Sequence, residues 1–121
     1  MNADERVPRW LDDLGTTLET AAELVARGRD VFDADPAVPL ALEALSNRAG
    51  NLAKRLLAAD AERFGDPIWR QAARQRDFVV HHYARVDADL LWRTVSGSFP
   101  SLADVVRAER ERPSELATKE E

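Results

Sequence analysis

The chain has 121 residues, no cysteine and a formal net charge of -5. This length suits one domain with a hydrophobic core, and the missing cysteines exclude disulfides and thiolate zinc sites. The negative charge argues against nonspecific nucleic-acid binding through the whole surface. The charged N-terminus lacks the apolar stretch of a signal peptide, and no apolar run approaches the ~18 residues of a membrane span. We therefore expect a cytoplasmic protein with no membrane association.

The first half of the chain predicts two long helices. One covers about residues 8–27, because apolar side chains recur there at three- and four-residue steps: Leu11, Leu14, Leu18, Ala21 and Val25. Residues 29–35 are mostly polar and predict a loop. Asp35 and Pro36 then give a helix start signal, and the second helix runs to about residue 60. Two helices of similar length with a short connection predict an antiparallel hairpin.

The second half predicts three further helices. Asp66 and Pro67 repeat the start signal before a helix over about residues 67–84. A short helix follows over about residues 88–96 and is closed by Gly97. The last begins at Pro100 and ends before Pro113.

These elements predict an all-α fold, an antiparallel four- or five-helix bundle. Residues 1–112 would form one helical domain. Residues 113–121 are polar, and we expect them to be a disordered C-terminal tail.

The segment Arg76-Asp77-Phe78-Val79-Val80-His81-His82-Tyr83 has the pattern R-x4-H-x-Y. On a helical wheel Arg76 falls within the apolar arc, where a guanidinium needs a partner or must extend its head into solvent. The other interpretation is a functional arginine in a cleft or a subunit interface. Arg76 and His81 fall about 140 degrees apart, so one regular helix would not bring both to one phosphate. Either the helix ends or bends near His81, or a second copy of the chain completes the site.

Three further arginines, Arg70, Arg74 and Arg85, make this region locally basic. Such a stripe on an acidic protein is compatible with binding RNA phosphates, and the alternative is a solvated helix face with ion pairs. The single acid of the region, Asp77, precedes His81 by four residues. A carboxylate at this spacing can touch the imidazole and orient it.

Histidine and arginine together suit RNA cleavage by the 2'-hydroxyl. Histidine moves protons near neutral pH, and arginine binds the phosphate and stabilises the charge of the transition state. The sequence shows neither a metal-ligand spacing nor a phosphate-binding glycine loop. We therefore expect no metal and no cofactor.

The segment Arg76 to Tyr83 matches the signature of HepT-like toxins of the HEPN superfamily. The chain resembles this family over roughly residues 9–109, including Gly65-Asp66-Pro67-Ile68-Trp69 and Phe99-Pro100-Ser101-Leu102. The resemblance implies a helical homodimer that acts as a metal-independent endoribonuclease, with the motif at the dimer cleft. Arg76 and His81 would be the catalytic pair, and transfer RNA is a substrate of some members.

The resemblance also implies a partner, an MntA-like nucleotidyltransferase that serves as antitoxin. It would transfer adenylate to Tyr83 and block the RNA site with bulk and negative charge. Departures from the family pattern include Asp77 where asparagine is common, His82 where the residue is usually small, and Ala84 where an aromatic is common. Two alternatives stay open: a catalytically dormant helical dimer that docks a nucleotidyltransferase or binds a nucleotide, and a structural bundle with Arg76 paired in its interior.

Overall fold

The computed structural model of the chain describes the backbone of residues 3–81 and 88–112 and the side chains of residues 5–75 and 88–112. The described elements are α1 (Ala3–Ala26), α2 (Arg29–Ala34), α3 (Ala37–Ala59), α4 (Pro67–His81), α5 (Ala88–Arg93), the π-helix η2 (Thr94–Ser98) and α6 (Phe99–Glu111). No strand occurs in these residues, so the predicted all-α bundle is confirmed. The tail from residue 113 onward, predicted to be disordered, lies outside the described residues.

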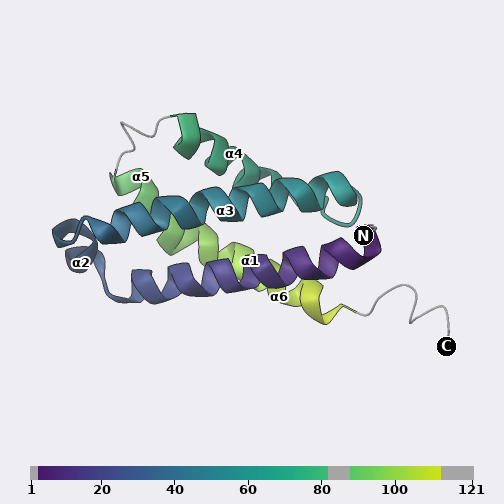
Figure 1. Cartoon of the computed structure of the whole chain (residues 1–121), viewed down its shortest axis with the longest axis horizontal. Helices are drawn as coiled ribbons and strands as arrows, with labels where there is room; N and C mark the ends of the chain where they lie inside the picture. The colour runs from purple at the N-terminus through teal and green to yellow at the C-terminus, as the bar shows by residue number, and fades with distance from the viewer. Residues whose placement is uncertain (1–2, 82–87, 113–121) are drawn as a thin grey trace.

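The long helices α1 and α3 run antiparallel and side by side, which confirms the predicted hairpin (Figure 1). α4 folds back along the other side of α3, so that α3 lies between α1 and α4. α6 packs against α1. The central position of α3 therefore makes it the wall against which α4, the motif helix, is held.

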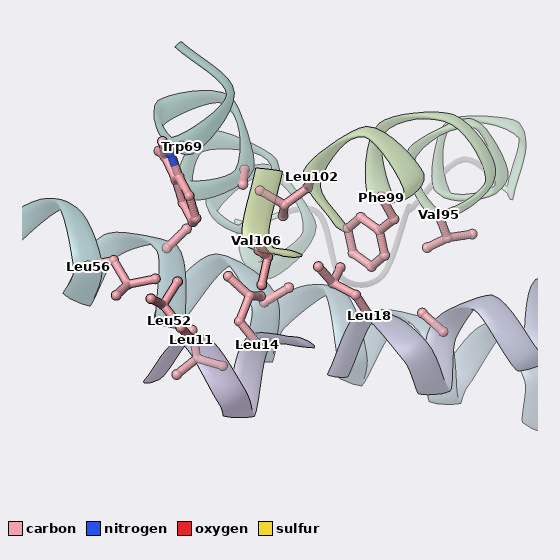
Figure 2. Packing of buried hydrophobic residues seen from close by; sticks show 14 of the residues in the cluster. Leu11, Leu14, Leu18, Leu52, Leu56, Trp69, Val95, Phe99, Leu102 and Val106 are labelled. Carbon is pink, nitrogen blue, oxygen red and sulfur yellow. The ribbon is translucent and has the colours of Figure 1, made fainter. Parts of the chain in front are cut away.

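One apolar core joins these helices (Figure 2). The stripe predicted on the first helix is buried at Leu11, Leu14 and Leu18. Burying a leucine side chain contributes about 1.5–3 kcal/mol, so these periodic positions drive the packing of α1. No helix in the described part of the chain is long and apolar enough to cross a membrane.

The prediction of a loop over residues 29–35 is wrong, because Arg29–Ala34 forms α2. Phe32 is buried, and its ring meets that of Trp92 edge-on at 5.2 Å. The Arg29 guanidinium lies over both rings and forms salt bridges with Asp33 at 2.9 Å and Asp89 at 2.7 Å. Contacts with α5, sixty residues away, thus stabilise a segment whose own composition is that of a loop.

The expected helix stop at Gly97 is also wrong. The chain passes through η2 directly into α6, and Gly97 does not take a positive φ. The hydroxyls of Thr94 and Ser96 donate to carbonyl oxygens four residues earlier, at 2.9 and 2.6 Å. Val95 and Phe99 are both buried, so continuous helix keeps two core side chains in place where a break would expose one.

α1 begins at Ala3, about one turn before the predicted start, and contains Pro8. Pro8 is the sixth residue of α1, so the carbonyl of Asp4 loses its intrahelical donor, and this loss is confined to the N-terminal turns of the helix. Val7 is buried, and Arg6 lies 5.7 Å from the Trp10 ring. Gly28, with φ 96°, follows α1, in agreement with the predicted end.

Candidate functional site

The start of α4 is fixed by the sequence around Asp66. Its Oδ1 accepts a hydrogen bond from the backbone N–H of Ile68 at 3.0 Å, and Pro67 occupies the first helical position. Two residues on, the buried ring of Trp69 meets Phe64 edge-on, with centroids 4.9 Å apart. The N-terminal end of the motif helix is therefore held both by a cap and by aromatic packing.

The face of α4 that meets the core continues to Arg76. Trp69, Ala72 and Ala73 are buried, and Arg76 follows them at the seven-, four- and three-residue spacings of one helix face. The buried residues of α3 include three small ones, Ala49, Gly50 and Ala53, beside larger apolar residues. Small side chains allow two helix axes to approach closely. The backbone of Arg76 thus lies on the packed face, as the wheel predicted; its side chain is not among those described.

The opposite face of α4 carries exposed arginines. Arg70 and Arg74 are exposed, and neither forms a salt bridge with another residue in the described ranges. Arg29, by contrast, is held by two carboxylates. His81 follows Arg74 by seven residues, which puts its backbone on the same face. Two positive charges therefore lie along the face that leads to the motif histidine.

α4 does not bring Arg76 and His81 together. It is α-helical from Pro67 to His81, with no 3-10 or π turn inside it. A separation of five residues puts the two backbone positions about 140 degrees apart. The requirement that the helix ends at His81 or that a second copy completes the site therefore stands.

The structure describes the other predicted site residues only in part. Asp77 belongs to α4, but its side chain is not described. Tyr83 and Arg85 lie outside the described residues. Among the side chains that are described, no three carboxylate or imidazole groups are close enough to hold a metal ion.

A hydrogen bond that the sequence did not predict ties α4 to η2. The Gln75 side-chain amide donates to Ser98 Oγ at 3.2 Å, next in sequence to Arg76. Extra turns of π-helix inside α-helices occur often at functional sites. The bond gives the motif half of α4 a polar attachment to the last helices of the chain.

A polar stripe on α3 was also missed. Glu43, Ser46 and Asn47 are spaced at i, i+3 and i+4 and share one face. Burial raises the pKa of the Glu43 carboxyl. Ser46 is 4% exposed, and its hydroxyl and the side-chain oxygen of Asn47 are buried without a hydrogen-bond partner. The signal was present in the sequence as three polar residues at helical spacing within an apolar helix.

The fold and the motif helix agree with the comparison with known families. The chain matches the family described as ribonuclease HepT-like over residues 14–109, and it belongs to this family of the HEPN superfamily. The resemblance inferred from the R-x4-H-x-Y motif is thereby confirmed.

One curated relative is the probable ribonuclease HepT of Thermococcus cleftensis. It is 50% identical over 34 residues, which cover 28% of this chain and 31% of that protein. The match thus spans about a third of the relative's length. No solved structure matches the chain.

Proposed function

We propose that the protein is the toxin of a toxin–antitoxin pair, an endoribonuclease that cleaves RNA in the cytoplasm without a metal ion. The observation that carries this proposal is the motif helix of a HepT-like ribonuclease, α4, with Arg76 on its packed face. His81 lies on the face of Arg70 and Arg74, which form no salt bridge among the residues whose side chains are described. The name of the curated relative, a probable ribonuclease, supports the same reaction class.

The chemistry assigns one role to each member of the pair. The 2'-hydroxyl of RNA attacks the adjacent phosphorus, and the bond to the 5'-oxygen breaks. Arg76 binds the phosphate and stabilises the charge that accumulates on its oxygens. His81 transfers a proton, for which an imidazole is suited near neutral pH. Asp77, four residues before His81, orients that imidazole.

The helix geometry supports a homodimer. Because Arg76 and His81 lie on different faces of one α-helix, one phosphate is reached by both most simply when two copies of α4 face each other. Each shared site then takes Arg76 from one copy and His81 from the other. Arg70 and Arg74, with Arg85, bind the flanking phosphates of the substrate.

Control of the activity rests with a second protein. An MntA-like nucleotidyltransferase adenylylates Tyr83, two residues after His81. The added phosphate carries negative charge, which repels the RNA backbone, and the adenosine occupies the space that the substrate needs. Transfer RNA is the substrate class we propose to test first.

The test is cleavage of total transfer RNA in the presence of EDTA by wild-type protein and by His81→Ala. Mass spectrometry of each preparation first verifies that Tyr83 carries no adenylate. We expect cleavage by wild type alone. If dimeric, unmodified wild type leaves the RNA intact, the enzyme proposal is wrong and a dormant module that docks the nucleotidyltransferase replaces it.

A further inference from the structure

A shallow groove lies between α4 and the helices that close the bundle, η2 and α6. The side chains of Phe99 and Leu102, both buried, belong to its apolar floor (Figure 2). Its polar rim consists of Gln71 and Gln75 of α4 and Ser98 of η2, and none of the described lining residues is charged. An apolar floor with a few polar groups is the usual composition of a ligand site.

The size of the groove limits what can occupy it. Its enclosed space is about 10 Å³, enough for about one water molecule. A ligand can therefore place only one small polar group inside, while its body rests on the rim. A nucleobase fits this description, because it is a flat ring with small polar groups that project from its edge.

The two rim glutamines belong to a short repeat in the sequence of α4. They are the only glutamines of the chain, and each directly follows an exposed arginine, in Arg70-Gln71 and Arg74-Gln75. Adjacent residues lie about 100 degrees apart around a helix, and residues four apart lie about 6 Å apart along it. The repeat therefore places a row of two cations beside a parallel row of two carboxamides.

A hydrogen bond fixes the orientation of one carboxamide. Gln75 Nε2 donates to Ser98 Oγ at 3.2 Å. The oxygen of the same amide, Oε1, accepts no hydrogen bond from any described residue. An amide oxygen accepts hydrogen bonds and cannot donate them. Gln75 therefore offers an acceptor to an occupant of the groove, while the exposed Gln71 can turn either end of its amide toward it.

We propose that this groove is a nucleobase subsite of the RNA-cleaving site, and that it selects a base with an exocyclic amino group. This inference rests on the proposed ribonuclease function. The amino group of adenine, cytosine or guanine donates to Gln75 Oε1, and Gln71 pairs with the neighbouring ring nitrogen. Uracil is rejected, because both of its exocyclic groups are carbonyl oxygens and cannot donate to Oε1.

The repeat also assigns the two parts of a nucleotide to two faces of α4. Arg70 and Arg74 hold phosphates on one face, and the bases turn toward the groove on the next. Phosphate contacts of this kind position a strand, and base contacts specify its sequence. The backbone of His81 lies six residues beyond Gln75, about 9 Å along α4. The selected base therefore belongs to a nucleotide near the cleaved bond.

The test sequences the products that wild type, Gln75→Met and Ser98→Ala release from an RNA pool of randomised sequence. Wild type should disfavour uracil by about 10-fold at one fixed position near the cut. Gln75→Met keeps the length of the side chain and removes the acceptor, so it should lose this discrimination. Ser98→Ala frees the amide to turn Nε2 toward the base, so uracil should become acceptable. Thr20→Val, at an exposed position of α1, is the control and should keep the wild-type preference.

A second measurement isolates the amino group itself. In an RNA that is cut at one site, purine replaces adenine at the selected position and thus removes only the amino group. The cleavage rate of wild type should fall by about 10-fold, and that of Gln75→Met should stay the same for both substrates. The wild-type comparison needs no variant, so it decides the matter should Gln75→Met misfold.

The contrary outcomes are equally distinct. If wild type shows no base preference near the cut, or if the preference survives in Gln75→Met, the groove is not a base subsite. Equal losses of rate at every sequence in Gln75→Met and Ser98→Ala would show that their hydrogen bond only supports the fold, an effect that urea unfolding would report. Wild type that cleaves no RNA overturns the proposed function, and this inference with it.

Discussion

The guanidinium of Arg63 lies 2.7 Å from the carboxylate of Glu109, and this ion pair joins the turn before α4 to the last turns of α6. Arg63 also donates to the backbone oxygen of Glu109 at 3.3 Å and lies 5.1 Å from the Phe64 ring. The contact matters because Phe64 in turn packs on Trp69, the first buried residue of the motif helix.

Replacing Arg63 by methionine should lower the free energy of unfolding by about 1 kcal/mol, measured by urea denaturation. The methionine keeps the stem that packs on Phe64 and removes the charge. The loss stays small because Glu109 retains a second arginine, Arg112, at 3.7 Å. Arg107→Met is the matched control. Its ion pair with Asp104 is largely exposed, so its stability should not change measurably. Equal losses in both variants would contradict a special role for the Arg63 contact.

Trp69→Ala should be the most disruptive single change in α4. The indole is 1% exposed and packs between Phe64 and the core, so its removal leaves a cavity and costs about 3–5 kcal/mol. Thermal and urea unfolding measure the loss. Trp10, half-buried on α1, gives the control, since Trp10→Ala should cost clearly less. RNA cleavage should fall with Trp69→Ala, because the helix that carries Arg76 loses its anchor; a stable, fully active variant would contradict this.

The helices whose signals are local were predictable from sequence. Asp66 caps α4 by accepting a hydrogen bond from the backbone N–H of Ile68, only two residues on. Leu11, Leu14 and Leu18 are buried in the core at the spacing that predicted them. α2 was not predictable, because Phe32 is buried by Trp92 and no pattern within residues 29–35 contains that contact. The passage through Gly97 likewise depends on core positions on both sides of it.

Part of the candidate site could likewise be predicted from the sequence, and part could not. The Arg76 and His81 pair could be found from a short spacing, and the packed face on which Arg76 lies could be read from a wheel. The stripe of α3 was overlooked because helical spacing alone does not say which polar atoms lack a partner. That fact depends on how the helices pack around α3, which only the folded bundle determines.

Stability should depend on pH through Glu43. Burial raises the pKa of its carboxyl in the folded state, so the folded state binds a proton more tightly than the unfolded chain does. The contribution of Glu43 to stability is therefore most favourable below the ordinary glutamate pKa, and it declines as the pH rises through the raised value. Glu43→Gln removes this decline, so the variant should gain stability over wild type on going from acid to neutral pH. Urea unfolding of both proteins across this range checks the sign, with Glu19→Gln as control; a constant difference would contradict it.

The exposed arginines of α4 should set the salt dependence of RNA binding. Each phosphate contact to a single strand contributes about 0.7 to the slope of log K against log salt concentration. Arg70→Ala with Arg74→Ala should therefore flatten this slope by about 1.4 and weaken binding without changing which RNA is cut. Binding is measured with His81→Ala, which preserves the substrate, by fluorescence anisotropy over a series of salt concentrations. Arg107→Ala with Arg112→Ala, a pair already engaged by carboxylates on α6, is the control and should leave the slope near that of the parent. An unchanged slope in the α4 variant would show that Arg70 and Arg74 do not contact RNA phosphates. The RNA would then bind to another face of the protein.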